Sequence, residues 1–297
     1  MSYTILFQAF INGLIMSCLY ALMAMGLTFI YSIMKMINWA MGEFYMLGSY
    51  IQYFLVISFL GVNYWVLGLP ISMIIVFIVG VIFYEGLIKP MFVKGIERKD
   101  EYATIITITF GMVIMRNLAS LIAGPYYYST PDYLHPIQLG LIRISGNRIV
   151  ALIGSVIGLG AFYLFIKKSW QGRAFRAVAQ NRIGALLSGV NVLHVDRIGF
   201  GLGVALSALA GALLLPEFTA HPECGVMATV KGFEIIVIGG IGSIPGAVIA
   251  SFVLGLAESL FSVIFSASYR DVYGFIALII ILLLRPRGIM GEKEREA

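Results

Sequence analysis

Charged residues are scarce in this chain. Only 12% of its 297 residues are Asp, Glu, Lys or Arg, whereas a soluble globular domain carries about 25%. Apolar residues make up 60% of the sequence, and its mean hydropathy is +0.95. This composition excludes a soluble domain and indicates an integral membrane protein.

Potential metal ligands and nucleotide-binding motifs are also scarce. The sequence has two cysteines and three histidines, and none of them has metal-ligand spacing. We expect Cys18, which lies within an apolar run, to be a small buried residue. No GxxxxGK[ST] loop occurs, so the chain does not bind ATP in that manner. We therefore expect no metal and no cofactor on this chain, and its energy source must be a partner or an ion gradient.

Long apolar runs dominate the sequence. A bilayer core about 30 Å thick is crossed by about 20 apolar helical residues, and eight runs approach or exceed this length. They are residues 8–33, 43–60, 65–88, 103–123, 148–166, 197–217, 233–264 and 270–284. The first residues lack the basic segment of a signal peptide, so we expect the first run to be retained. The pattern predicts an all-α polytopic membrane protein with a single transmembrane domain over residues 1–297.

Basic residues lie mostly on one side of these runs. Of 20 Lys and Arg residues, 15 lie at Lys35, in residues 85–102, in residues 167–197 and after Leu284. Because cytoplasmic loops accumulate Lys and Arg, we expect these segments to be cytoplasmic, and the N-terminus and residues 124–147 to be outside. The same distribution explains the net charge of +5, so we do not expect nucleic-acid binding.

A glycine-rich stretch interrupts the run over 233–264. It reads Gly-Gly-Ile-Gly-Ser-Ile-Pro-Gly over residues 239–246. Glycine costs about 1 kcal/mol and proline about 3 kcal/mol in a helix interior relative to alanine. If all eight runs crossed once, both termini would lie on the same side, against the charge pattern. We therefore interpret residues 228–264 as a hairpin that enters from outside, breaks in or near the cytoplasmic half and returns, which leaves about seven full crossings.

Two interpretations of this hairpin remain open. Irregular backbone at membrane depth must be buried in protein or line a polar cavity, and broken helices often form the translocation path of transporters. In the first interpretation the path residues are Gly239, Gly240, Gly242, Ser243, Pro245 and Gly246. In the second, the stretch is a tight packing turn without contact to substrate.

A second interruption lies between the first two runs, over residues 35–43. An ionisable residue within a membrane costs several kcal/mol unless it is paired or hydrated, so Glu43 is a path candidate together with Asn38 and Gly42. Glu43 is equally explained as a carboxylate at the N-terminus of the second helix. We expect the other charged residues beside the runs to be interfacial or ion-paired. They are Glu85, Arg116, Glu217, Lys231, Glu234 and Glu258.

Residues 167–197 form the longest basic segment. Their apolar residues alternate with polar ones at the spacing of a short amphipathic helix, and Gly189 supplies a helix stop. The two sets are Ala174, Val178, Leu186 and Val190, and Arg173, Arg176, Asn181 and Arg182. Such a helix on the cytoplasmic face either binds lipid head groups or inserts into a groove on a partner protein.

Four stretches carry a resemblance to a known family. They run from Gly26 to Asn38, from Gly42 to Tyr50, from Gly172 to Ala177 and from Gly239 to Ala247. With them the chain resembles, over essentially its whole length, the H-type permease subunit of branched-chain amino-acid ATP-binding-cassette importers. That family usually has Asn-Phe-Ala-His-Gly-Glu where residues 38–43 read Asn-Trp-Ala-Met-Gly-Glu, so the resemblance does not extend to a titrating histidine there.

The resemblance implies that residues 167–197 hold a coupling helix that sits in a cleft of an ATPase subunit. Ala185-x3-Gly189 is similar to the end of the EAA-x3-G pattern of other importer permeases, with Ile183 and Gly184 in place of its first two residues. The residues implied for this contact are Arg173, Arg176, Asn181, Arg182, Ala185, Leu187 and Gly189.

The resemblance further implies a bacterial inner-membrane permease for branched-chain amino acids. Its implied partners are a second homologous permease, two ATPase subunits that bind ATP and Mg²⁺, and an extracytoplasmic binding protein. Within the same superfamily, urea, short amides and sugars remain alternative substrates. An ion-coupled secondary transporter is the alternative from another class, and it would not need a coupling helix. An intramembrane enzyme would need a paired acid and base, which the sequence does not offer.

Overall fold

Helices make up nearly all of the regular structure in the computed structural model, which describes residues 3–93, 99–139 and 142–291. The α-helices are α1 (Tyr3–Met34), α2 (Met41–Phe54), α3 (Trp65–Phe83), α4 (Lys89–Val93), α5 (Lys99–Ile106), α6 (Arg116–Ala123), α7 (Gly146–Lys168), α8 (Trp170–Gln180), α9 (Arg182–Leu187), α10 (Val192–Leu214), α11 (Cys224–Gly239), α12 (Ile244–Ile264) and α13 (Arg270–Leu284). They are extended or joined by π-helical stretches η1 (Leu55–Leu60), η3 (Tyr84–Ile88) and η4 (Thr107–Met115), and by 3-10 turns η2 (Val62–Tyr64) and η5 (Ala267–Tyr269). A short antiparallel hairpin pairs β1 (Ile137–Leu139) with β2 (Ile142–Ile144).

Eight helical segments in the described part of the chain are long and apolar enough to cross a membrane. They are Ile5–Met34, Met41–Leu60, Val62–Val93, Glu101–Ala123, Gly146–Lys168, Val192–Leu214, Ile244–Ile264 and Ala267–Leu284. The prediction of an all-α polytopic membrane protein is therefore confirmed. The run predicted over 233–264 is divided between two helices, α11 and α12, and of these α12 is among the eight.

The helix interruption predicted at the glycine-rich stretch is present. The chain turns over residues 240–243 between α11 and α12. With 16 residues, α11 is about 24 Å long at 1.5 Å per residue, which is less than the bilayer core of about 30 Å. This length fits an α11 that does not cross fully, whereas α12 is long enough to cross. The depth of the hairpin in a membrane stays a prediction.

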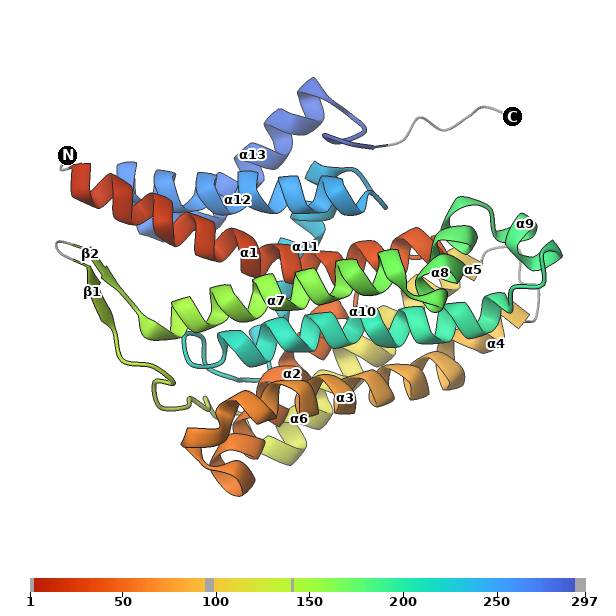
Figure 1. The fold of residues 1–297 in the computed structure, drawn as a ribbon, viewed down its shortest axis with the longest axis horizontal. Helices are drawn as coiled ribbons and strands as arrows, with labels where there is room; N and C mark the ends of the chain where they lie inside the picture. The colour runs from red at the N-terminus through yellow and green to blue at the C-terminus, as the bar shows by residue number, and fades with distance from the viewer. Residues whose placement is uncertain (1–2, 94–98, 140–141, 292–297) are drawn as a thin grey trace.

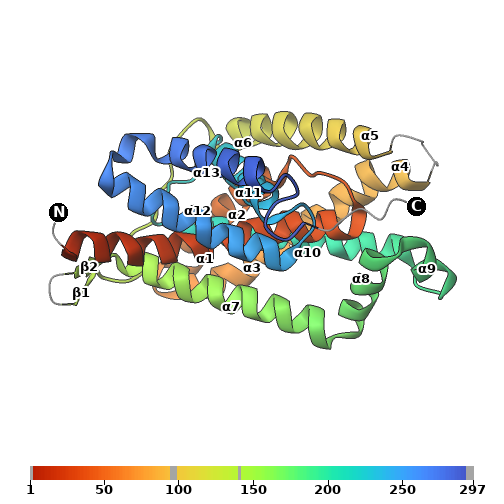
Figure 2. The same cartoon turned by 90° about the horizontal axis from the view of Figure 1, so that it is seen from above.

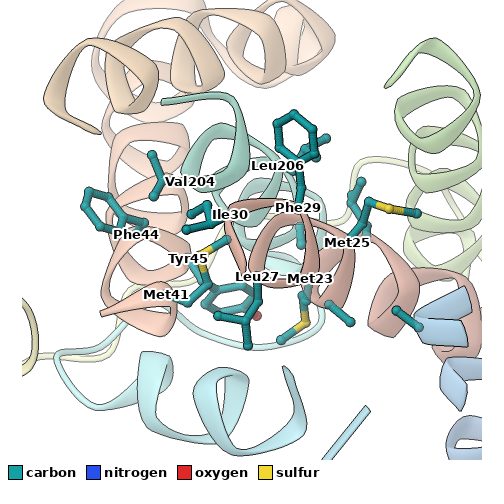
Figure 3. Close-up of a cluster of buried hydrophobic side chains, with 14 of the residues drawn as sticks. Met23, Met25, Leu27, Phe29, Ile30, Met41, Phe44, Tyr45, Val204 and Leu206 are labelled. Atoms are coloured by element: carbon teal, nitrogen blue, oxygen red, sulfur yellow. The ribbon is translucent and has the colours of Figure 1, made fainter. Parts of the chain in front are cut away.

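The centre of the bundle is formed by α1 and α10. Over their most apolar windows, 94% of α1 and 83% of α10 are buried. Figure 3 shows Ile30 of α1 beside Phe44 of α2 and Val204 of α10. Because α1 is apolar on all sides, it can be surrounded by other helices. The remaining helices are arranged around this pair (Figure 1).

Two helices are exposed along most of their length. The buried share is 11% for the helix over 101–123 and 6% for the helix over 267–284. Their exposed side chains include Leu121, Ile122 and Leu283, which are suited to lipid or to another membrane subunit. Figure 2 shows α6 and α13 on the same side of the bundle.

The two ends of the bundle carry different elements. The amino end of α1 and the β1–β2 hairpin lie at one end, and α8 and α9 lie at the other (Figure 1). This arrangement separates the segment over 124–145 from the basic segment over 167–197, as the distribution of Lys and Arg requires.

Cysteine labelling is expected to distinguish these two ends. Tyr127 is 72% exposed at the end expected outside, and Leu187 is 83% exposed at the end expected in the cytoplasm. In a background with Cys18 and Cys224 replaced by serine, Tyr127→Cys should react with an impermeant maleimide on intact cells. Leu187→Cys should react only after permeabilisation. Labelling of both positions to the same extent on intact cells would contradict this orientation.

Candidate functional site

The backbone leaves the helix between α1 and α2 while it is inside the bundle. Residues 35–40 are not helical, and Met36 and Asn38 are buried. The hydroxyl of Ser207 in α10 donates to the carbonyl oxygen of Met41 over 3.0 Å. Ser207 lies about 22 Å from the start of α10 at 1.5 Å per residue. The junction is therefore a stretch of irregular backbone deep in the bundle, and it is buried in protein as such backbone must be.

Asn38 satisfies the backbone of this junction. Its Oδ1 accepts a hydrogen bond from the amide of Ala40 over 3.0 Å, and its Nδ2 lies 3.8 Å from the sulfur of Met41. A short polar side chain that bonds its own backbone stabilises a turn before a helix. Asn38 thus has a structural role at the start of α2, and its place on the translocation path stays a prediction.

Glu43 is paired with an arginine from a distant part of the chain. It lies in the first turn of α2 with no exposed surface, and its Oε1 is 2.6 Å from Nη2 of Arg116. The carboxylate is therefore placed both at a helix N-terminus and in an ion pair. Glu43 Oε2 and Arg116 Nε are buried and have no hydrogen-bond partner among the described atoms.

The helix over 101–123 packs against the segment that leads to Glu43. The amide of Trp39 donates to Oγ1 of Thr107 over 3.3 Å. Gly111 faces Ala40 so closely that a Cβ on Gly111 would overlap the Ala40 side chain. Arg116 lies about one turn beyond Gly111 and contacts Glu43. Successive turns of this helix, at Thr107, Gly111 and Arg116, therefore contact residues 39–43.

The other side of the same segment packs against α11. The amide of Gly42 donates to Oγ1 of Thr229 over 3.1 Å, and a Cβ on Gly42 would overlap the carbonyl oxygen of Gly225. The ring of Trp39 stacks on Phe233 with centroids 4.3 Å apart. Residues 39–43 therefore lie between α11 and the helix over 101–123.

The glycines at the end of α11 allow backbone segments to touch. Gly239 and Gly246 face each other across the α11–α12 turn without room for a Cβ on either. Gly240 has φ +100, a conformation that favours glycine, and a Cβ there would overlap the backbone of Gly291. These contacts favour the packing-turn interpretation for these three glycines. A leucine at Gly240 is expected to disturb folding as well as uptake.

The remaining residues of the turn start α12. Oγ of Ser243 accepts a hydrogen bond from the amide of Gly246 over 3.1 Å and caps the helix. Pro245 lies in the first turn, where proline is tolerated. Gly242 has φ +86, and the nearest atom to a Cβ there is 3.2 Å away on the ring of Tyr31. Of the six path candidates in this stretch, Pro245 is exposed, Gly242 and Ser243 are half-buried, and the other three are buried.

The two predicted parts of the path do not meet in this structure. Gly42 contacts the first turns of α11 through Gly225, whereas Gly239 ends that helix. The distance between Gly225 and Gly239 along α11 is about 21 Å at 1.5 Å per residue. α11 thus connects the two groups, and the path role of both stays a prediction.

A second group of buried charges lies on the opposite side of α11. Glu258 of α12 has no exposed surface, so of the two alternatives expected for it, an interfacial position or an ion pair, the structure shows the ion pair. Its Oε1 is 2.6 Å from Nζ of Lys231, and its Oε2 is 3.1 Å from Nε of Arg270. The hydroxyl of Tyr20 donates to Oε2 over 2.8 Å. Both oxygens of this carboxylate are therefore satisfied.

Lys231 also forms ion pairs with two further carboxylates in this group. Its Nζ is 3.2 Å from Oε2 of Glu234 and 3.1 Å from Oδ1 of Asp271. Lys231 and Glu234 are both buried, as ion-paired charges within a membrane protein commonly are. Among the described residues, no group of three or more His, Cys, Asp and Glu side chains is arranged to hold a metal ion.

The basic segment folds into two short helices, α8 and α9, where the sequence suggested one. Asn181 separates them, and its Oδ1 accepts a hydrogen bond from the amide of Gly184 over 2.8 Å, which caps α9. Gly189 has φ +84, and the amide of Val190 donates to Ala185 O over 3.0 Å. This is the hydrogen-bond pattern of a glycine-terminated helix, so the stop predicted at Gly189 ends α9.

The three arginines predicted for coupling have different surroundings. Arg173 lies over the ring of Trp170 at 4.7 Å, and Arg176 donates to the carbonyl oxygen of Ile166. Arg182 forms a two-bond ion pair with the fully buried Asp196, with Nη1 and Oδ1 3.0 Å apart. Arg182 therefore fastens α9 to α10, and a change to glutamate there would disturb the bundle itself.

The outer face of α9 is apolar and uncovered. Ile183, Leu186 and Leu187 are 71%, 61% and 83% exposed, while Ala185 on the inner face is buried. A short capped helix at the end of the bundle thus presents three large apolar side chains. Such a patch on an otherwise polar surface marks an interaction site.

Comparison with known proteins identifies the family. The sequence profile of the family described as "Branched-chain amino acid transport system / permease component" matches residues 9–284. The chain belongs to this family. It is similar to the high-affinity branched-chain amino acid transport system permease protein LivH of Salmonella typhimurium, with 33% identity over 302 residues, 97% of this chain and 96% of the relative. It is also similar to the corresponding protein BraD of Pseudomonas aeruginosa, with 31% identity and 97% of both chains covered. No solved structure matches the chain.

This membership fixes the broad role of the protein. The chain is a multi-pass membrane permease subunit of an ATP-binding-cassette importer and is not an enzyme, because its relatives over almost the whole length are transport permeases. ATP hydrolysis belongs to separate subunits.

Sequence reasoning missed Arg116 as a partner of Glu43. The two residues are 73 positions apart, and no local spacing connects them. The available signal was that each is an isolated charge of opposite sign in an apolar run, since such charges tend to pair. Lys231 of α11 and Glu258 of α12 are likewise isolated opposite charges in apolar runs, and they also pair.

Proposed function

We propose that this permease, together with a second homologous permease, forms the path by which branched-chain amino acids enter a bacterial cell across its inner membrane. An extracytoplasmic binding protein delivers the substrate, and two ATPase subunits that bind ATP and Mg²⁺ dock at the α8–α9 end. The substrate class is supported by the two relatives from Salmonella and Pseudomonas, which are named as branched-chain amino acid permeases and match nearly the whole chain.

The exposed face of α9 is the observation that carries the coupling part of this proposal. Its side chains Ile183, Leu186 and Leu187 project from a helix that is capped at both ends and tied to α10 by Arg182. A rigidly held helix can pass a movement of its partner to the bundle, whereas a loose loop cannot. An amphipathic helix inserted into an apolar groove is a common mode of protein recognition.

Other substrates of the superfamily remain the competing possibility. The chain is 25% identical to a ribose import permease, RbsC of Haemophilus influenzae, over 53% of its length. The likeness to the amino acid permeases covers 97% of the chain, which favours an amino acid. Uptake of radiolabelled leucine, urea and ribose by the reconstituted complex, with its binding protein present, decides between them.

Polar substitutions on α9 are expected to weaken ATPase binding. Ile183→Asp adds a carboxylate near the N-terminus of α9, where a negative charge stabilises the helix. The change should therefore leave α9 folded and weaken only its apolar contact with the ATPase subunit. Burying a large apolar side chain such as Ile183 or Leu187 fully contributes about 1.5–3 kcal/mol of favourable free energy. Together with Leu187→Gln, we expect at least a tenfold loss of ATPase co-purification and of ATP-dependent leucine uptake.

Lys168→Asp is the matched control for this test. It also changes charge at the α8–α9 end, and its side chain is exposed outside α9. We expect ATPase binding and uptake close to wild type. If the α9 variant kept normal ATPase association and uptake, α9 would not be the partner site, and the ATPase subunits would have to dock on another part of the α8–α9 end.

A further inference from the structure

The ion pair of Glu43 with Arg116 leaves hydrogen-bonding capacity unused. It joins a single guanidinium nitrogen, Nη2, to a single carboxylate oxygen, Oε1. Glu43 Oε2 accepts no hydrogen bond and Arg116 Nε donates none to any described atom, although both are buried. Buried polar atoms in proteins nearly always have a partner. Two unsatisfied atoms of opposite character on one buried pair therefore need a physical explanation.

Two other Arg–carboxylate pairs among the described residues use more of their donors. Arg148 donates from both Nε and Nη2 to Glu217, with Nε 2.7 Å from Oε1. Arg182 donates from Nη1 and Nη2 to the two oxygens of Asp196. These are two-bond pairs of the kind that fastens one segment to another. The pair at Glu43 differs because it keeps one acceptor and one donor available.

We propose that Glu43 and Arg116 form the subsite that holds the charged end of an α-amino acid during its passage. The ammonium group of the substrate donates to Glu43 Oε2, and its carboxylate accepts from Arg116 Nε. Each contact joins opposite charges and is a charge-assisted hydrogen bond. The inference rests on the proposed function, since it takes an amino acid as the transported molecule.

The surroundings of the pair fit a point of substrate passage. Glu43 follows the non-helical residues 35–40, and a helix interruption of this kind is where transporters place their substrate sites. The side chain of Arg116 is 27% exposed and belongs to the helix over 101–123, which is exposed along most of its length. Few side chains of the protein cover the outer face of this helix. A small displacement of the helix would expose Glu43 Oε2 and Arg116 Nε to a transported molecule.

An apolar surface for the substrate side chain lies close by. The stacked rings of Trp39 and Phe233 are both half-buried, and Trp39 precedes Glu43 by four residues. A branched aliphatic side chain would bury apolar area against these residues. Urea and sugars carry no opposite charges for Glu43 and Arg116, so the chemistry favours a zwitterion.

Glu43→Gln tests the inference because it keeps the size of the side chain. Its amide oxygen still accepts from Arg116 Nη2, but its NH₂ group replaces the free acceptor. We expect uptake of radiolabelled leucine per assembled complex, in vesicles with ATPases and binding protein, to fall roughly 10- to 100-fold. Glu217→Gln, in the pair with Arg148, is the matched control and should transport as wild type.

The exchange of the two charges separates binding from a purely structural role. Glu43→Arg combined with Arg116→Glu restores an ion pair but reverses the two free groups. We expect the complex to assemble and leucine uptake to remain low. Recovery of uptake in the exchange variant, or wild-type uptake by Glu43→Gln, would overturn the inference.

A binding measurement tests the same subsite without the exchange variant, so it does not depend on how well that variant assembles. The wild-type complex without binding protein is titrated with three ligands in a thermal-shift assay. Leucine carries both charged groups, leucinamide lacks the carboxylate, and 4-methylpentanoate lacks the ammonium group. Leucine should stabilise the complex most, since ligand binding stabilises the folded state. Glu43→Gln should lose the preference for leucine over 4-methylpentanoate, and an unchanged preference would overturn the inference.

The wild-type complex distinguishes this inference from the proposed function. If wild type takes up no amino acid, the proposed substrate is wrong and the inference fails with it. If wild type takes up leucine and Glu43→Gln does so equally well, the inference alone fails.

Discussion

Glu258→Ala is expected to remove most of the assembled permease from the membrane. The substitution removes the carboxylate that Lys231 and Arg270 both contact. The buried Lys231 keeps only the longer contacts to Glu234 and to the half-exposed Asp271. Breaking a buried ion pair by removing one partner costs about 3–5 kcal/mol, which is a large share of the about 5–15 kcal/mol that holds a native domain together. Fluorescence-detected size-exclusion chromatography and the melting temperature of the purified complex measure the loss.

Two variants calibrate this result. Glu258→Gln keeps an acceptor for Tyr20 and Arg270 and should lose less stability than alanine. Glu85→Ala removes a carboxylate from partly exposed pairs with Lys89 and Arg197, where solvent screens the charges, and should lose much less stability than Glu258→Ala. If Glu258→Ala melted at the wild-type temperature, the buried network would not hold the helices together.

This network explains how the interrupted hairpin is held in place. Its members come from four helices: Tyr20 from α1, Lys231 from α11, Glu258 from α12 and Arg270 from α13. α13 is exposed along most of its length, so its apolar contacts within the chain are few. The charges therefore tie α13 and the hairpin to the central helix, at a depth where screening by water is weak.

Most of the helices could be predicted from the sequence, because their apolar length is set by the bilayer. The position of the break at Gly240 was also predictable, since glycine and proline there oppose a helix. Gly189 ended a helix as expected because its φ of +84 suits a glycine. In each case the signal lies within a few residues of the feature that it determines.

Contacts between distant segments could not be predicted in the same way. Nothing near Gly240 indicates that its neighbour is Gly291, and nothing near Glu43 indicates Arg116. The separation of α8 from α9 at Asn181 was missed because an asparagine within an amphipathic pattern serves equally as a surface residue or a cap. Arg182 looked like a surface arginine because its partner Asp196 lies 14 residues away, beyond the end of α9.

Gly42→Ala is expected to destabilise the permease although it adds only one methyl group. The Cβ would overlap the carbonyl oxygen of Gly225 and the hydroxyl of Thr229, so α2 and α11 would have to move apart. The amide of Gly42 would then lose its hydrogen bond to Thr229, now 3.1 Å long. Overpacking of a close-packed interior costs about 1–3 kcal/mol, and the melting temperature of the purified complex should fall.

Gly160→Ala gives the opposite expectation and is the matched control. Gly160 is exposed within α7, and a Cβ there meets no atom within 4 Å. Alanine favours a helix over glycine by about 1 kcal/mol, so this variant should melt at or above the wild-type temperature. Because both substitutions add the same methyl group within a helix, the difference between them reports the α2–α11 contact itself. Equal melting temperatures for the two variants would show that α2 and α11 do not approach closely at Gly42, and the position of Glu43 beside Arg116 would then need revision as well.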